Sequence, residues 1–182
     1  MATIRMLFGV LCLAAVGSYR MPHRNLLGAD EQQRVRLLNI ARTQIGVRER
    51  TGQNDGEQVE RYLATTGLKK GQPWCAAFIS WVFKEGGYNA PRTAWSPALF
   101  NTRVNTKKPE TCNIFGIWFP ELKRIAHVGL IEKREGDWLI SIEGNTNVPG
   151  SREGDGVYRK RRPFKNIYLI SDWLKGKELS DE

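Results

Sequence analysis

The sequence predicts a single α+β domain in which N-terminal helices pack on a small antiparallel β-sheet. Apolar residues recur at helical spacing in the first half of the chain, whereas short apolar segments with strand-like patterning follow Phe115. A hydrophobic content of 41% is typical of a folded globule, and 182 residues suffice to bury a core without disulfide or metal staples. These observations favour one domain with helices first and strands second.

Two helices are expected ahead of the central cysteine. The first should run from about Asp30 to the helix-stopping Gly46. Its predicted buried face has four apolar residues: Val35, Leu38, Ala41 and Ile45. The loop RERTGQNDG is rich in turn formers and leads to a second helix that ends at Gly67. This second helix should bury three residues: Val59, Tyr62 and Leu63.

A third helix is expected in the segment GQPWCAAFISWVF, residues 71–83. Pro73 lies one residue before its apparent start, and Gly86-Gly87 should end it. A short helix should begin at Ser96-Pro97, because serine caps helices and proline favours their first turn. Beyond these helices we expect five strands: GIWF, IAHVGLIEK, DWLISIEG, GVYRKRR and IYLI.

The first 17 residues are predicted to be a secretory signal peptide. Arg5 supplies a positive charge, the apolar run MLFGVLCLAAV is too short to span a bilayer, and residues 15–17 are small. An uncleaved anchor or a buried helix is the alternative. We therefore expect a signal peptide at 1–17, a linker at 18–29, a folded domain at 30–174 and a tail at 175–182. Export would place the protein in the periplasm or outside the cell.

The three cysteines, Cys12, Cys75 and Cys112, lack the CxxC spacing that zinc ligands usually have. Loss of the signal peptide would leave Cys75 and Cys112, which could pair in an oxidising compartment. Such a disulfide would prevent chemistry at either thiol.

The formal net charge of +9 favours a polyanionic partner: nucleic acid, an anionic lipid surface or an anionic cell wall. Part of this charge is clustered in YRKRRPFK, residues 158–165. A solvated charged face is the alternative. The interleaved aromatic residues that are typical of a nucleic-acid module are absent from the sequence pattern.

Cys75 is either a small buried hydrophobe or a nucleophile. Its expected position in the first turn of a helix favours a nucleophile, because unpaired amide groups and the helix dipole stabilise a thiolate there. The same amides can bind an oxyanion, which stabilises the tetrahedral intermediate of acyl transfer.

A general base for Cys75 is expected at His127, because the only other histidine, His23, lies in the linker. A half-buried structural histidine is the alternative. The next strand ends in SIEGNTN, and a hairpin joins the two strands. A loop of residues 134–136 would place Glu143 across from His127, and a loop of residues 135–137 would place Asn145 there. A two-residue loop would instead place Gly144 there, so the sequence leaves the register and both orienting groups open.

Three blocks, PWCAAFISWVF, AHVGLIE and SIEGNTN, together resemble the CHAP amidases and peptidases. These are papain-like cysteine hydrolases that cut bacterial peptidoglycan. The resemblance covers about residues 35–160 and implies a papain-like fold, a nucleophile at Cys75, a base at His127, and orienting or polar roles at Glu143 and Asn145. The chain departs from the family at FGIWF, where relatives usually carry a Gly-Asp-Ile strand. It also lacks the DCSG pattern of the related NlpC-type peptidases.

Five further residues are candidates for contact with substrate. Trp74 and Trp95 could stack on sugar or line the cleft, with packing as the alternative. Asn54 and Asp55, in TGQNDGE, could line the cleft or bind calcium, with a plain turn as the alternative. Gln72 could donate to the oxyanion hole.

The sequence thus predicts an exported thiol hydrolase that cleaves an amide bond in peptidoglycan. The bond would be that of an N-acetylmuramoyl-L-alanine amidase or of a stem-peptide endopeptidase. We expect a monomer without a metal or organic cofactor and without a nucleic-acid partner. Two alternatives are a catalytically silent wall-binding module and an antibacterial effector with the same chemistry.

Overall fold

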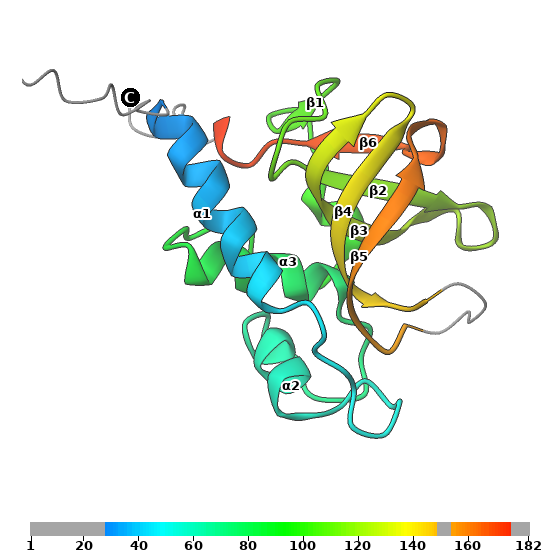
Figure 1. Ribbon diagram of the computed structural model, residues 1–182. Coiled ribbons are helices and arrows are strands. Elements are labelled where there is room, and N and C mark those ends of the chain that lie inside the picture. Colours follow the sequence, from blue (N-terminus) through cyan, green and yellow to red (C-terminus); the bar gives the residue numbers. More distant parts are fainter. Residues whose placement is uncertain (1–27, 149–153, 176–182) are drawn as a thin grey trace, which may run out of the picture.

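The computed structural model describes residues 28–148 and 154–175. Over these residues three α-helices pack against one six-stranded antiparallel sheet (Figure 1), which confirms the predicted α+β class. The expected signal peptide, residues 18–27 of the expected linker and residues 176–182 of the expected tail lie outside the described residues. Within the described part of the chain, no helix is both long and apolar enough to cross a bilayer.

The helices lie close to their predicted positions. They are α1 (Ala29–Thr43), α2 (Glu57–Ala64) and α3 (Cys75–Glu85), followed by the short 3-10 helix η1 (Ser96–Leu99). The predicted core residues of α2 are all buried. The predicted face of α1 is wrong in part, because Val35 and Ile45 are exposed. Leu38 and Ala41 are buried as predicted, and Arg34 and Leu37 complete the buried face. Arg34 can lie on this buried face because its guanidinium forms hydrogen bonds with buried oxygen atoms.

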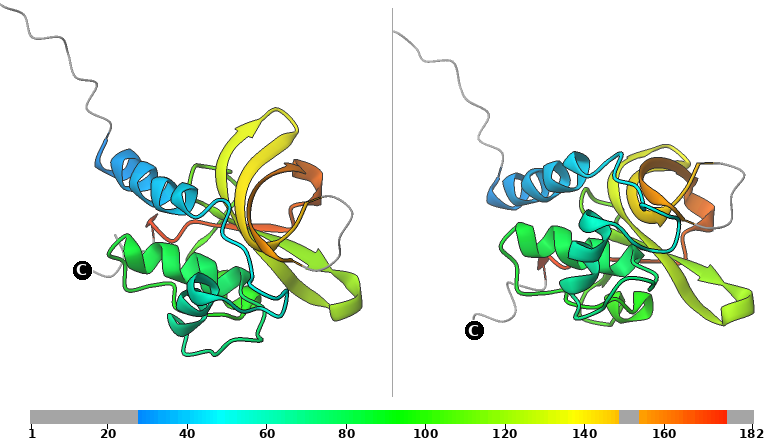
Figure 2. Two further views of the ribbon diagram at one scale, coloured as in Figure 1. Left: turned by 60° about the horizontal axis from the view of Figure 1, so that its bottom comes forward. Right: turned by 90° about the horizontal axis from the view of Figure 1, so that it is seen from below.

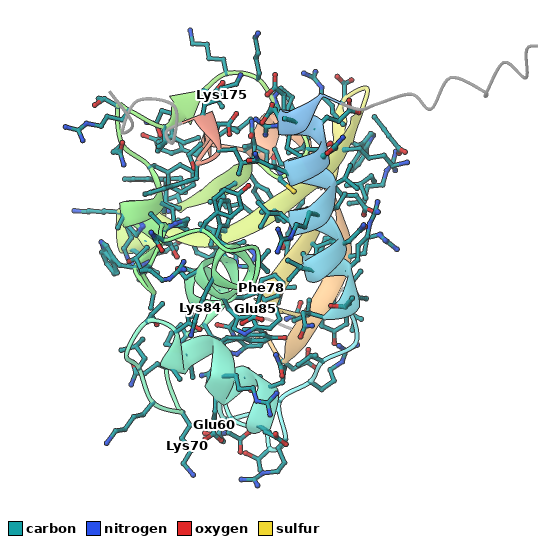
Figure 3. The ribbon with its side chains drawn as sticks, turned by 90° about the vertical axis from the view of Figure 1, so that its left-hand side faces the viewer. Glu60, Lys70, Phe78, Lys84, Glu85 and Lys175 are labelled. Atoms are coloured by element: carbon teal, nitrogen blue, oxygen red, sulfur yellow. The ribbon has the colours of Figure 1, made fainter. Side chains whose placement is uncertain are left out.

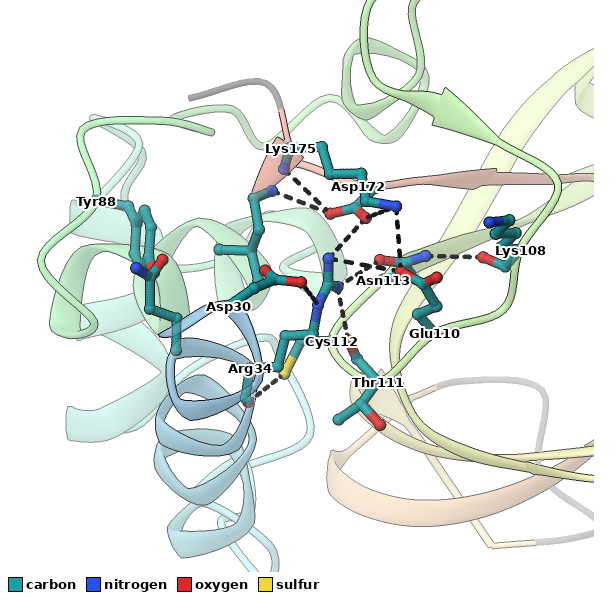
Figure 4. A network of polar contacts seen from close by, with 12 residues as sticks. Asp30, Arg34, Tyr88, Lys108, Glu110, Thr111, Cys112, Asn113, Asp172 and Lys175 are labelled. Carbon is teal, nitrogen blue, oxygen red and sulfur yellow. Dashed lines mark hydrogen bonds and ion pairs between the residues drawn. The ribbon is translucent and has the colours of Figure 1, made fainter. Parts of the chain in front are cut away.

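Those partners tie α1 to the segment between β1 and β2 and to the C-terminal end of the described chain (Figure 4). The Arg34 guanidinium donates to four oxygens: Asp30 Oδ2 at 3.0 Å, Thr111 O at 2.9 Å, Asn113 Oδ1 at 3.0 Å and Asp172 Oδ2 at 2.8 Å. The Cys112 thiol donates to the carbonyl oxygen of Arg34 at 2.8 Å. Burial raises the pKa of Cys112 to about 12, so this thiol stays protonated.

The sheet has the strand order β1-β6-β2-β3-β4-β5. Its strands are β1 (Asn105–Thr106), β2 (Ile114–Phe119), β3 (Arg124–Glu135), β4 (Trp138–Thr146), β5 (Gly156–Pro163) and β6 (Leu169–Ser171). The five predicted strands are confirmed, whereas β1 was not predicted because its two polar residues carry no alternation. Short 3-10 helices, η2 (Pro120–Leu122) and η3 (Phe164–Asn166), follow β2 and β5. Figure 2 shows that the sheet is strongly curved, with β4 and β5 bending round.

Apolar side chains cover both faces of this curved sheet. The larger cluster lies between the helices and the sheet and includes Phe78 of α3, which Figure 3 shows in the interior of the domain. A smaller cluster contains Phe115, Ile131, Leu139 and Ile170. Complete burial of one such side chain contributes about 2 kcal/mol. The strands next to α3 are therefore held on both sides, which keeps their polar side chains in place.

Candidate active site

Cys75 is the first residue of α3, directly after Trp74 at the N-cap position. The helix begins there with the hydrogen bond that the amide of Phe78 donates to the carbonyl oxygen of Trp74 at 2.8 Å. The N–H groups in the first turn of a helix have no hydrogen-bond partner within the helix. They therefore place positive partial charge near the Cys75 sulfur. Cys75 and Cys112 are both free thiols, which excludes a disulfide between them in this structure.

Three groups outside α3 contact the Cys75 sulfur. The Ser96 hydroxyl lies 3.5 Å away, and the His127 side chain and the Val128 amide also form hydrogen bonds with the sulfur. Burial by itself raises the pKa of Cys75, but the hydrogen bond and charge of His127, helped by the other two donors, outweigh burial and lower it. The thiol is therefore predisposed to ionise.

His127 lies between the thiol and a carboxylate. Its Nε2 is 2.7 Å from Glu143 Oε2, which leaves Nδ1 as the ring nitrogen for the thiol. Burial lowers the pKa of His127, but the hydrogen bonds to Cys75 and Glu143 outweigh it and raise the pKa to about 9. The imidazole is thus held as imidazolium at neutral pH, between two acidic partners.

A β-bulge lies immediately beside His127. Ile117 pairs with His127, but the next residue of β2, Trp118, pairs with Ile125, so Ala126 is left without a partner. Bulges of this kind redirect neighbouring side chains. Ile125 accordingly packs in the larger core cluster, whereas His127 on the other side of the bulge reaches Glu143.

The hairpin between β3 and β4 has neither of the two three-residue loops that the sequence allowed. Glu135 pairs with Trp138, so the loop has two residues, and a second bulge at Glu132 shifts the register by one. The Glu132 carboxylate accepts hydrogen bonds from Arg42 of α1 and Arg159 of β5, which fixes this bulge.

The pairing of β3 and β4 beyond this bulge sets the geometry of the site. Beyond the bulge Leu130 pairs with Ile142, and continuation of this register brings Gly129 opposite Glu143. A Cβ atom on Gly129 would lie 2.6 Å from Glu143 Cγ. The missing side chain therefore leaves the space through which Glu143 reaches diagonally to His127.

Glu143 is fully buried and accepts hydrogen bonds at both of its oxygens. Oε1 accepts from Ser141 Oγ at 2.6 Å and from Arg162 Nε at 2.9 Å. Oε2 accepts from Arg162 Nη2 at 2.5 Å as well as from His127. Burial raises the pKa of Glu143, but Arg162 and His127 outweigh it and lower the pKa to about 2. The carboxylate is ionised and cannot rotate without losing a partner.

Asn145, the other predicted orienting group, does not contact His127. Its Oδ1 accepts from the backbone amide of Trp74 at 3.0 Å, and its Nδ2 donates to Asn54 Oδ1 at 3.1 Å and to Gly154 O at 3.3 Å. The residue has a positive φ of 52°, a conformation that asparagine tolerates better than most residues. Asn145 thus ties β4 to the residue that precedes Cys75.

For Trp74, substrate contact and packing were the two alternatives, and the structure supports packing. Its side chain is fully buried, its Nε1 donates to Glu49 Oε1 at 2.8 Å, and its ring stacks on Tyr62 with centroids 5.5 Å apart. Its bulk fixes the start of α3. Trp95, in contrast, is 54% exposed, precedes Ser96 in sequence, and carries the Arg124 guanidinium 4.5 Å above its ring. Trp95 is therefore the tryptophan of this pair that is available to a substrate.

Asn54 and Asp55 stabilise their own loop. The amide of Asn54 donates to Glu49 Oε2 at 2.8 Å, and the Asp55 carboxylate accepts from the amide and the hydroxyl of Thr51, both at 2.9 Å. Asp55 is also buried, so the plain-turn interpretation replaces a role in the cleft. No cluster of three or more potential metal-ligating side chains occurs in residues 28–148 and 154–175. Gln72 is exposed, three residues ahead of Cys75.

Three residues of the site were missed from the sequence: Ser96, Ser141 and Arg162. Ser141 could have been found, because it lies two residues before Glu143 on the same face of a strand. Arg162 belongs to the four consecutive basic residues of β5, 159–162, each of which has a partner. In order, these partners are the Glu132 carboxylate, the Asn147 carbonyl oxygen, the Trp138 ring and the Glu143 carboxylate. Two of the four charges are thus neutralised by buried carboxylates.

The arrangement places a thiol, an imidazole and a buried carboxylate in one continuous line of contacts at the start of a helix. Such a line can activate a nucleophile, transfer a proton to a leaving group and stabilise an oxyanion. The chain matches no protein-family model, and comparisons with curated proteins and with solved structures found no match. The assignment of a function therefore depends on the chemistry of Cys75, His127 and Glu143.

Proposed function

We propose that this protein is a papain-like cysteine hydrolase that cleaves an amide bond in peptidoglycan. The observation that carries the proposal is the contact of Cys75 with His127 and of His127 with Glu143, at the N-terminus of α3. The resemblance of the three sequence blocks to CHAP amidases and peptidases supports the substrate class. The apolar N-terminal sequence and the net charge of +9 support export toward an anionic wall.

The reaction follows from the roles of these groups. The Cys75 thiolate attacks the carbonyl carbon of the amide, and the oxyanion that forms is stabilised by first-turn amides of α3. The His127 imidazolium gives its proton to the leaving amine, so that the C–N bond breaks and a thioester remains. His127, now neutral, takes a proton from water, which attacks the thioester and releases the acid, so that the Cys75 thiolate and the His127 imidazolium are restored. Glu143 keeps the imidazole oriented throughout.

The test is digestion of purified peptidoglycan by the protein and by Cys75→Ala, with mass spectrometry of the products. A new amine at the stem-peptide N-terminus identifies an amidase, and a new amine within the peptide identifies an endopeptidase. Cys75→Ala should lower turnover by several orders of magnitude, whereas the matched control Cys112→Ala should remain active because Cys112 packs against α1. Hydrolysis by Cys75→Ala at close to the wild-type rate would refute the proposal.

A further inference from the structure

We propose that Arg162 is a positioning residue of this site, which keeps the Glu143 carboxylate charged and aligned on His127 Nε2. This inference rests on the proposed function for its significance, but the contact that carries it is independent of any substrate. Arg162 lies on β5, Glu143 on β4 and His127 on β3, so the alignment spans three neighbouring strands.

The geometry is that of a bidentate clamp. Nε and Nη2 of Arg162 donate to the two different oxygens of Glu143, at 2.9 and 2.5 Å. The planar guanidinium matches the carboxylate plane, so the pair fixes the orientation of Glu143 as well as its distance. The Arg162 side chain is 26% exposed and that of Glu143 is fully buried, which means that solvent screens this pair weakly.

Without this clamp, a buried Glu143 would have a strong tendency to take up a proton. Burial of a carboxylate favours its neutral form, and an adjacent cation is what opposes this. Four polar side chains face Glu143: His127 from β3, Ser141 from β4, and Arg162 and Lys160 from β5. Of the two cations from β5, Arg162 donates hydrogen bonds to the Glu143 carboxylate, whereas the Lys160 ammonium donates to the carbonyl oxygen of Asn147.

Arg162 also balances the charge of the reactive form. Thiolate, imidazolium, carboxylate and guanidinium alternate in sign along the line from Cys75 to Arg162, so the four charges cancel. A neutral group of charges needs less solvation in a buried site than one with an excess negative charge. Loss of Arg162 would leave an excess of one negative charge whenever Cys75 is ionised, and this would disfavour the thiolate.

The experiment measures the pH dependence of Cys75 alkylation by iodoacetamide, which reports thiolate and needs no substrate. Arg162→Met should raise the midpoint of the acid limb by about one pH unit. Arg162→Lys keeps the positive charge but loses the two parallel hydrogen bonds of the guanidinium, so it should raise this midpoint by less. Arg161→Met is the matched control, because Arg161 is the neighbouring residue of β5 and lies over the Trp138 ring, 4.0 Å from its centroid. This variant should leave the profile unchanged.

A double variant tests whether Arg162 acts through Glu143. In the Glu143→Gln background the carboxylate is absent, so Arg162→Met should cause little further shift. Equal shifts with and without Glu143 would show that Arg162 acts on the thiolate directly, and this would overturn the proposed clamp. Unchanged alkylation profiles in folded Arg162→Met would also overturn it. If Arg162→Met does not fold, an unchanged profile in Arg162→Lys has the same meaning.

The outcome separates this inference from the proposed function. An ordinary thiol profile for wild-type Cys75 would refute the activated nucleophile and with it the hydrolase. If the acid limb of the wild-type protein lies at low pH and stays there in Arg162→Met, the role of Arg162 is refuted but the hydrolase is not.

Discussion

Glu143 binds Nε2 of His127 at 2.7 Å, although the strand register places Gly129 opposite Glu143. The contact is diagonal across two strands and passes over a residue that has no side chain. The carboxylate reaches the imidazole because of this gap, and it is held there by groups from two further positions. Three consequences of this arrangement, and one of the separate buried ion pair between Arg34 and Asp172, can be measured.

Glu143 and Asn145 should differ in their effects on the histidine. Glu143→Gln keeps the shape but removes the ion pair, so the apparent pKa of His127 should fall and turnover should drop on the order of 10²-fold. Asn145→Ala removes the contact with the Trp74 amide, and should instead lower the free energy of unfolding by about 1–2 kcal/mol with little change in the pH profile. Hydrolysis and thermal unfolding of both variants test this pair of expectations. An unchanged rate and pH profile in Glu143→Gln would remove Glu143 from the mechanism.

The pH profile of hydrolysis should have a basic limb near the pKa of His127, about 9. Because this pKa is raised above that of an ordinary histidine, the imidazolium persists through neutral pH and is lost as the pH rises past about 9. Above that value no proton is available for the leaving amine, so the rate should fall. The acid limb should lie below the ordinary pKa of a cysteine, because the Cys75 pKa is lowered. A rate that keeps rising through pH 9 would contradict this assignment.

Gly129→Ala should reduce turnover by displacing Glu143. The added Cβ would lie 2.6 Å from Glu143 Cγ and 2.7 Å from the Phe115 ring, so one of these side chains has to move. Such overpacking also costs about 1–3 kcal/mol of stability. We expect the pH profile of Gly129→Ala to shift in the same direction as that of Glu143→Gln. Gly28→Ala is the control, since a Cβ there meets nothing within 4 Å. Normal activity in Gly129→Ala would show that the gap is dispensable.

The buried pair of Arg34 and Asp172 should matter for stability and not for chemistry. Their side chains are 6% and 3% exposed, so Arg34→Met leaves a buried carboxylate without its main cation and should cost about 3–5 kcal/mol. The double variant Arg34→Met/Asp172→Leu should lose less than the sum of the single variants, because it leaves neither charge unpaired. Urea unfolding measures both effects. A strictly additive double variant would show that the two charges do not interact.

The sequence predicted the positions of the helices and strands better than it predicted which of their side chains are buried. Periodicity and turn residues located three helices and five strands, because these signals are local. The buried face of α1 was predicted only in part, because an apolar pattern gives no weight to Arg34, whose burial depends on oxygens far away in the sequence. For the same reason exposure could not be assigned to the two tryptophans: Trp74 is buried and Trp95 is exposed.

The candidate site was predicted in part. Cys75, His127 and Glu143 could be selected because each has the chemistry of its role and a position that allows the three to converge. Glu143 could not be distinguished from Asn145, because the choice depends on a bulge at Glu132 and on a diagonal contact past Gly129, and no local signal specifies either. Arg162 was hidden in a basic run for a related reason. Its partner becomes visible only when the register of β4 and β5 is known.

The partnered basic run of β5 has a consequence for association between copies of the chain. An antiparallel sheet ends in two edges, and an edge with free backbone groups can add a strand from another molecule. Here one edge, β1, is only two residues long, and residues 46–48 bond to the start of β5 at the other. Of the four consecutive cationic residues on the rest of β5, 159–162, Lys160 and Arg161 bind a carbonyl oxygen and an aromatic ring, so their charges are not neutralised by a carboxylate. Two such edges repel each other, so the basic run that supplies Arg162 to the site also protects the sheet from growing by self-addition.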